Sequence, residues 1–131
     1  MQSSIFGVGP GVELPSFIGK TRMRDENVAW NVDAGFFCAL CALQKRVNYR
    51  SIPHYYFSID GKPFHFVGEM EQKYTEMIFD GDINDERFVI YYVWGEEIVG
   101  FLTVGYQNLH IYLHEAMKLL IMPPALHLRH K

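Results

Sequence analysis

The sequence has no run of about 20 apolar residues, little net charge, and no basic, apolar leader at its start. The first absence argues against a membrane-spanning helix, so no membrane partner is expected. A formal net charge of −3 gives no general attraction to phosphate backbones, so no nucleic acid is expected either. Without a secretory signal or an Arg-rich transit segment, an intracellular setting is the default, with the mitochondrial and cytoplasmic alternatives open.

Cysteine is also scarce, with only Cys38 and Cys41 present. Their C-x-x-C spacing is typical of redox motifs when it follows a strand in a thioredoxin-like context. Here the pair lies inside the apolar run FFCALCAL, with no preceding strand and no flanking base that would lower the pKa of a thiol. We therefore interpret both as buried structural thiols rather than as a redox pair.

What the chain does contain is typical of one globular domain. It has 131 residues, 49% of them hydrophobic and 15% aromatic, with 21% charged. This length is sufficient for a single core, and the aromatic content favours β-strands. The sequence contains neither an internal repeat nor a low-complexity tract.

The first part of the chain reads as an irregular head followed by a helix. Residues 1–25 are rich in glycine and proline, which predicts loops with a short extended piece at 4–8. Apolar residues at helical spacing predict a helix from 28 to about 45, buried on a broad face, and Asp25 or Asn27 is suited to cap it.

After the helix the hydrophobic pattern changes to period two, which indicates strands. Asp60-Gly61 and Gly95-Glu96 have the composition of tight hairpin turns. The strand at 87–94 is apolar on both faces, so we expect it to lie centrally and to be covered on both sides. Strands are predicted at 54–59, 63–69, 74–79, 87–94 and 97–105.

A last helix is predicted at 107–121, ended by Pro123-Pro124 and followed by a frayed tail. The predicted fold class is α+β: an antiparallel sheet of about five strands with a helix before it and a helix after it.

Two local patterns suggest ligand sites, but neither is complete. Gly7, Gly9 and Gly11 lack the strand, the helix start and the acidic residue of a dinucleotide-binding fingerprint. His110 and His114 have the i, i+4 spacing of a zinc-binding pair, but the catalytic glutamate of HExxH is missing. Two histidines on a solvated helix face are the favoured interpretation, and a metal-binding domain is the weaker alternative.

The order of several short motifs is more informative than any one of them. PHYYFS at 53–58 is followed by GKPFHFVGE at 61–69, FDGDI at 79–83, and a long hairpin and helix from Arg87 onward. This order resembles the C-terminal domain of apoptosis-inducing-factor-like and ferredoxin-reductase-type FAD-dependent NAD(P)H oxidoreductases. The resemblance implies that residues 1–26 are a remnant of the end of an FAD-binding domain and that residues 27–131 form the C-terminal, interface domain.

The same resemblance marks positions that face the flavin in this family. Its Gly-Asp strand end corresponds to Gly9 and Pro10, so the flavin-binding carboxylate is replaced by proline. Its His-Trp-type pair, which opens a helix beneath the flavin, corresponds to Asn27 and Val28.

The aromatic residue of the family's Pro-Tyr-x-Trp-Ser motif corresponds to Tyr55 or Tyr56, and the indole is not kept. Both dinucleotide-binding glycine fingerprints are absent from this chain. The resemblance implies FAD and NAD(P)H as cofactors of the parent family, and we expect this chain alone to bind neither.

Two functions remain open on this basis. The chain is either the C-terminal domain, or a truncated relative, of such an oxidoreductase, or a free-standing non-catalytic interaction module with the same fold. The first implies that the missing flavin- and NAD-binding domains or a protein partner cover it. Either one allows dimerisation or a larger homo-oligomer through an exposed apolar surface.

Overall fold

The computed structural model describes residues 5–19 and 22–130. The chain forms two compact units, Met1–Pro53 and His54–Lys131. The predicted α+β class is confirmed: within the described residues, a five-stranded antiparallel sheet is preceded by one helix and followed by the predicted helix and a further short one. The assignment of residues 1–26 to the end of an FAD-binding domain stays a prediction. No helix in the described ranges combines the length and the apolar character needed to cross a membrane.

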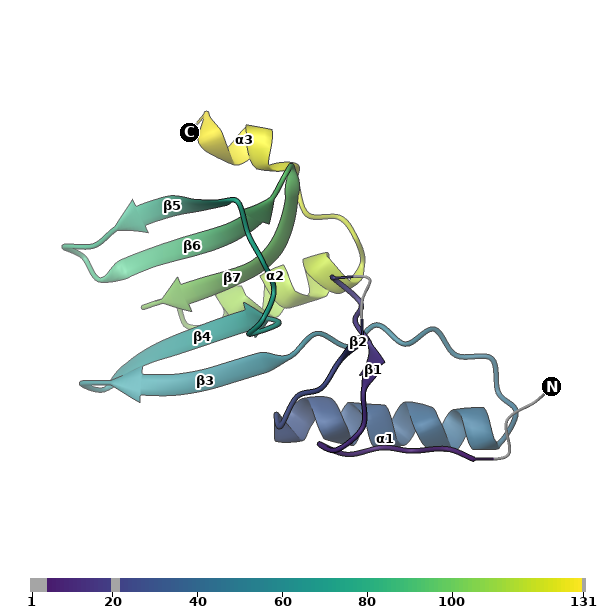
Figure 1. The fold of residues 1–131 in the computed structure, drawn as a ribbon. Helices are drawn as coiled ribbons and strands as arrows, with labels where there is room; N and C mark the ends of the chain where they lie inside the picture. The colour runs from purple at the N-terminus through teal and green to yellow at the C-terminus, as the bar shows by residue number, and fades with distance from the viewer. Residues whose placement is uncertain (1–4, 20–21, 131) are drawn as a thin grey trace. The chain divides into compact units, whose positions relative to one another are not determined.

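The first unit contains helix α1 (Val28–Ala42) and a small antiparallel ribbon of β1 (Leu14–Pro15) and β2 (Arg22–Met23) (Figure 1). The predicted extended piece at 4–8 is wrong for residues 5–8, which adopt no regular structure, and Ser4 lies outside the described residues. The predicted cap is confirmed at Asn27, whose side-chain oxygen accepts a hydrogen bond from the Trp30 N–H at 2.9 Å.

Helix α1 ends earlier than predicted and is less buried than predicted. It stops at Ala42, and Gln44 takes a positive φ of 57°, which breaks the helical path. Only Trp30 and Ala34 are buried, so the expectation of a broad buried face is wrong. The helix instead exposes a second set of apolar side chains, Val28, Val32, Phe36 and Leu43.

The second unit is built on the five-stranded sheet, in the order β3-β4-β7-β6-β5 (Figure 1). All neighbouring strands are antiparallel. Every predicted strand is present, within three residues at each end. The strands are β3 (His54–Ile59), β4 (Lys62–Gly68), β5 (Glu76–Asp82), β6 (Arg87–Trp94) and β7 (Glu97–Val104).

Both predicted hairpin turns are present. Asp60 and Gly61 have φ values of 51° and 78°, the two positive angles that a tight two-residue hairpin requires. Strand β6 has the expected inner position, but its residues alternate between buried and half-buried, so full cover on both faces is not observed. Strand β7, at the centre of the sheet, is the one buried on both faces, because it also packs beneath helix α2.

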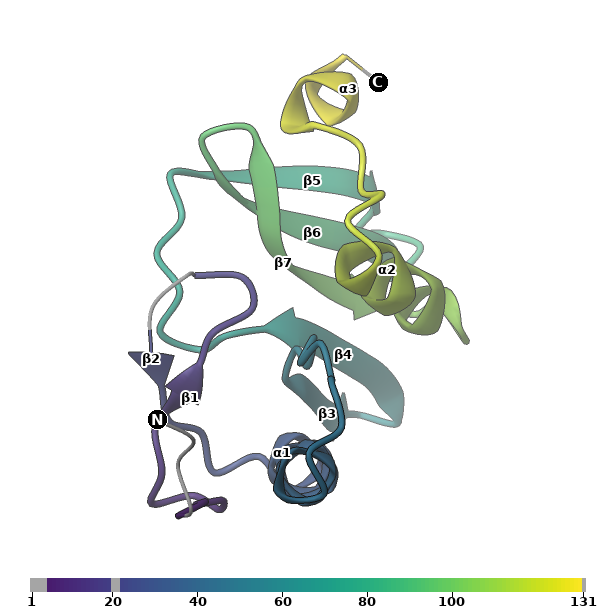
Figure 2. The ribbon, with the colours of Figure 1, turned by 90° about the vertical axis from the view of Figure 1, so that its right-hand side faces the viewer.

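The core of this unit consists of the fully buried side chains of Val67, Val93, Phe101 and Val104. Helix α2 (Leu109–Lys118) lies against one face of the sheet, next to β4 and β7 (Figure 2). It is shorter than the predicted helix at both ends. The positive φ of Leu120, 59°, ends the helical path after Lys118.

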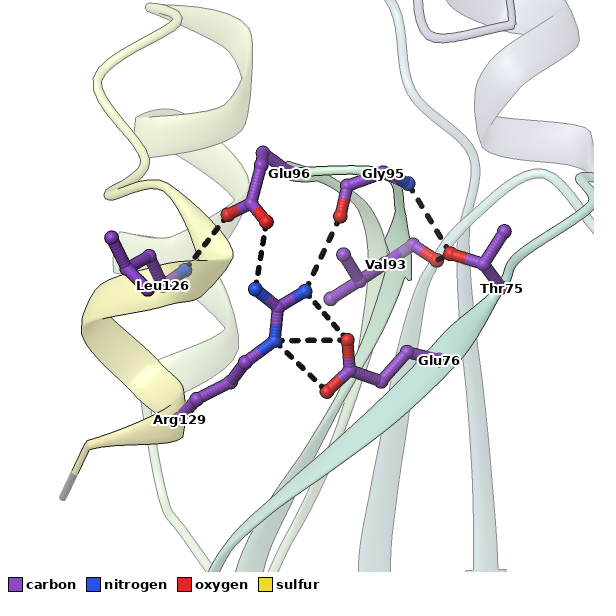
Figure 3. Close-up of polar contacts among 7 residues, drawn as sticks. All are labelled: Thr75, Glu76, Val93, Gly95, Glu96, Leu126 and Arg129. Atoms are coloured by element: carbon purple, nitrogen blue, oxygen red, sulfur yellow. Dashed lines mark hydrogen bonds and ion pairs between the residues drawn. The ribbon is translucent and has the colours of Figure 1, made fainter.

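The tail after Pro124 was predicted to be frayed, and this prediction is wrong. It forms the short helix α3 (Ala125–Arg129), which is anchored by charge (Figure 3). Arg129 donates hydrogen bonds to Glu76 on β5 at 2.6 Å and to Glu96 in the β6–β7 turn at 2.7 Å. Glu96 also accepts from the Leu126 N–H at 3.1 Å. These contacts join residues 30, 33 and 53 positions apart, which local sequence patterns do not reveal.

Candidate functional site

Histidines from three elements of the second unit meet on one face of the sheet. His54 lies on β3 and His65 on β4, and Tyr56 pairs directly with His65 in the β3–β4 ladder. Side chains two residues apart on a strand point to the same face, so His54 and His65 share the face that Tyr56 occupies. Helix α2 brings His110 and, one turn later, His114 to the same place.

The rings in this histidine cluster are in close contact. Nε2 of His54 and Nδ1 of His65 are 3.0 Å apart and share a hydrogen bond. The rings of His65 and His110 stack in parallel with centroids 3.5 Å apart and an interplanar angle of 5°. The His54 ring lies 5.2 Å from each of these two rings and 6.2 Å from that of His114.

The surroundings favour the neutral form of three of these rings, those of His54, His65 and His110. Burial, and then the neighbouring His110, His65 and His114, lower the pKa of His54 to about 4. Burial also lowers the pKa of His65, with a further contribution from His110, and lowers that of His110. Removal from water disfavours the charged imidazolium, and a second positive charge nearby disfavours it further.

The expectation that His110 and His114 project from a solvated helix face is therefore wrong. Both are half-buried, because α2 packs this side of the helix against β4. Nδ1 of His110 is fully buried and has no hydrogen-bond partner among the described residues. Buried polar atoms without a partner are rare in native proteins.

The flavin-facing positions implied by the resemblance are divided between the two units. Gly9 and Pro10 form a turn closed by a hydrogen bond from the Val12 N–H to the Gly9 carbonyl at 3.0 Å. Gly9 has a φ of 105°, and the Pro10 side chain is exposed. Asn27 caps α1, and Val28 at the start of that helix is exposed.

Tyr55 and Tyr56 lie on β3 in the second unit. Tyr55 contacts Phe66 with ring centroids 5.9 Å apart, whereas the exposed Tyr56 contacts His65 at 5.0 Å. The tyrosine that is free to meet another molecule is thus Tyr56, next to the histidine cluster.

The first unit contains an apolar cavity of about 500 Å³ between its head and helix α1. Cys38 and Cys41 line it, and both thiols are free. The interpretation of both as buried thiols is wrong, because Cys41 is exposed and Cys38 is only half-buried. Burial raises the pKa of Tyr49, another lining residue, to about 12. The cavity is lined by Ile5, Phe6, Gly7, Val8, Leu14, Pro15, Ser16, Phe17, Ala34, Phe37, Cys38, Cys41, Val47 and Tyr49.

The fold of the chain is shared with ferredoxin reductases, as the order of motifs predicts. One similar structure is the covalent complex of putidaredoxin reductase with putidaredoxin, with a TM-score of 0.71 and 19% identity over 87% of this chain. Another is the ferredoxin reductase of the CYP199A2 system from Rhodopseudomonas palustris, with a TM-score of 0.72 and 17% identity over 86% of this chain.

The chain spans only about a quarter of those reductases, 26% and 28% of their respective lengths. This proportion is consistent with a C-terminal domain. No protein-family model matches the sequence, and no curated protein matches it. At under 20% identity the likeness establishes the fold alone.

Proposed function

We propose that this chain is the C-terminal, interface domain, or a truncated relative, of an FAD-dependent NAD(P)H oxidoreductase. The observation that carries the proposal is how much of each chain is aligned. The alignment covers 87% of this chain but only 26% of the putidaredoxin reductase chain. In the family that the sequence resembles, the C-terminal domain closes over a cofactor bound by the other domains. The narrower resemblance to the apoptosis-inducing-factor type is part of the same proposal.

The exposed side of α1 supports a covering partner. Val28, Val32 and Phe36 follow one another at intervals of four, and Leu43 falls in the same sector of the helical wheel. These four side chains, the apolar stripe, are 63–77% exposed. Because Trp30 and Ala34 already face the interior of the unit, α1 is apolar on two sides, which is typical of a helix covered on both. In the family that the sequence resembles, this helix runs beneath the flavin.

We further propose that six residues occupy the family's flavin-facing positions but do not bind the flavin by themselves. They are Gly9, Pro10, Asn27, Val28, Tyr55 and Tyr56. Proline has no side-chain hydrogen-bonding group to offer a ribityl or pyrophosphate oxygen. The Asn27 side-chain oxygen is engaged with the Trp30 N–H. Catalysis would therefore require the flavin- and NAD-binding domains, and this domain would offer surface to them and to a protein electron acceptor. The reductase–putidaredoxin complex is a precedent for such an acceptor.

Two measurements test this function. Antibodies against the chain should detect a native protein several times heavier than its 15.3 kDa, and that protein should carry a flavin absorption band. The isolated chain, titrated with FAD and NADH, should remain colourless and leave flavin fluorescence unchanged. A native product of 15.3 kDa that never co-purifies with a flavoprotein would contradict the proposal.

The alternative function is a free-standing, non-catalytic interaction module. The apolar stripe favours this alternative equally, since a second copy of the chain can cover it. The native mass separates the two functions. A module has a native chain of 15.3 kDa and buries the stripe in a homo-oligomer, whereas a reductase domain buries it within a larger flavoprotein.

A further inference from the structure

We propose that His54, His65 and His110 form a binding site for a divalent transition-metal ion of zinc-like chemistry. The site lies entirely in the second unit and does not depend on the flavin proposal. Each of the three histidines offers one ring nitrogen, and these nitrogens all lie within 4.8 Å of one another.

The backbone arrangement is suited to such a site because each ligand comes from a different element. The tight Asp60-Gly61 turn fixes the register of β3 and β4, and the packing of α2 on β4 and β7 brings the third ring over them. A tetrahedral zinc ion with bonds of about 2.0–2.1 Å needs nitrogens about 3.3 Å apart. His54 and His65 already have ring nitrogens 3.0 Å apart. The rings of His65 and His110 are stacked in parallel, so the His110 ring would have to rotate out of this stack for its nitrogen to face the same ion.

Nδ1 of His110 adds an independent reason. It is buried and has no hydrogen-bond partner in the described part of the chain, so a polar atom is held inside the fold without an interaction that would offset its loss of water. A bound ion is one of the recognised explanations for such an atom. Coordination would also fix the tautomer of the ring, which its present surroundings leave undetermined.

The ligand chemistry selects the class of metal. Imidazole nitrogens suit zinc, copper and nickel, whereas magnesium and calcium prefer oxygen ligands. Within the described ranges, this cluster of possible ligands consists of histidines only. Three protein ligands leave a fourth position for water or for a ligand from another molecule. His114 lies one helical turn away, and its ring is 6.2 Å from that of His54.

The test uses the full chain, produced without a polyhistidine tag and stripped with a chelator. It is titrated at neutral pH with Zn²⁺ and, separately, with Co²⁺, whose visible absorption reports tetrahedral coordination. We expect one ion per chain by elemental analysis after gel filtration, affinity in the micromolar range or tighter, and a higher melting temperature, because the ion joins α2 to the β3–β4 hairpin. His65→Ala and His110→Ala should each weaken binding by at least about 10- to 100-fold, because even mutation of residues that only hydrogen-bond to metal ligands causes a loss of this size.

Two controls separate this site from other metal ligands. His127→Ala is the matched variant, since His127 is exposed on α3, and it should bind Zn²⁺ like the wild type. The Cys38→Ser/Cys41→Ser variant should do the same and should show no thiolate-to-cobalt band. Where an alanine variant fails to fold, His65→Gln and His110→Gln preserve most of the side-chain volume. Binding weaker than about 1 mM, binding that survives both histidine changes, or binding lost in the cysteine variant would each overturn the site.

Discussion

Asn27 illustrates how one residue can be explained by its local structure. Its side-chain oxygen accepts from the Trp30 N–H, and the Asn27 N–H in turn donates to an Asp25 carboxylate oxygen at 2.7 Å. The amide of Asn31 adds a hydrogen bond to the Asn27 carbonyl at 2.8 Å. The start of α1 therefore has its own polar network, and the identity of residue 27 follows from helix capping without any reference to a flavin.

Replacing this cap should weaken the first unit. We expect Asn27→Ala to lower the free energy of unfolding by about 1 kcal/mol, the usual cost of losing a polar N-cap. Urea unfolding followed by the fluorescence of Trp30, in a Trp94→Phe background that removes the tryptophan of the second unit, measures the change. Asn27→Asp, which keeps the acceptor, should stay within a few tenths of a kcal/mol of the wild type. Equal losses in both variants would show that the cap oxygen contributes nothing.

The histidine cluster depends on tertiary contacts that the sequence does not reveal. The i, i+4 pair on α2 was visible in the sequence, but its burial was not, because a helical wheel does not say which side meets the sheet. His54 and His65 were missed, although a signal existed: a two-residue turn at 60–61 pairs Tyr56 with His65 and places His54 on the same face. The unpartnered Nδ1 of His110 follows only from tertiary packing.

At the scale of elements, Arg129 holds α3 to the sheet together with two hydrogen bonds to Glu96, one from the Leu126 N–H at 3.1 Å and one from the Ala125 N–H at 3.0 Å. Arg129 bonds to both Glu76 and Glu96, and this interaction is the main cause that holds the pKa of each carboxyl below its ordinary value. A carboxylate whose pKa is lower in the folded than in the unfolded state stabilises the fold above the unfolded value. That stabilisation is lost as the pH falls through the folded value.

We therefore expect Arg129→Ala to loosen α3 at neutral pH and to have little effect in acid. Amide hydrogen exchange of residues 125–129 should be faster in the variant than in the wild type at pH 7. The difference should shrink below the ordinary glutamate pKa of about 4.3 and disappear below the lowered values. Arg46→Ala, at an exposed position in the other unit, is the matched control. An unchanged difference at pH 2 would contradict the electrostatic explanation.

Most elements could be predicted from the sequence because their signals are local. Period-two patterns with the Asp60-Gly61 and Gly95-Glu96 turns predicted the five strands, and the capping residue predicted the start of α1. The errors have long-range causes. Helix α3 needs carboxylates from β5 and from the β6–β7 turn. The extent to which β6 and α1 are buried depends on tertiary packing, which composition does not encode.

For the molecule as a whole, the apolar stripe on α1 should govern association. We expect Val32→Ser/Phe36→Ser to reduce self-association, because it removes two exposed apolar side chains, and to leave the free energy of unfolding within about 1 kcal/mol of the wild type. Sedimentation velocity over a range of concentrations measures the first effect, and urea unfolding measures the second.

Phe37→Ser is the matched control for this pair. Phe37 is half-buried and contacts Tyr49 edge to face at 5.0 Å, so its loss should destabilise the first unit without relieving association. If the stripe variant associates as strongly as the wild type, another surface is responsible.

The stripe also has a consequence for the lifetime of the protein in the cell. An exposed apolar helix face is the kind of surface that chaperones and proteases bind, so a copy of the chain made without its cover is removed sooner than a covered one. The steady-state amount of the chain should therefore follow the supply of whatever covers Val28, Val32, Phe36 and Leu43, even when its own synthesis is constant.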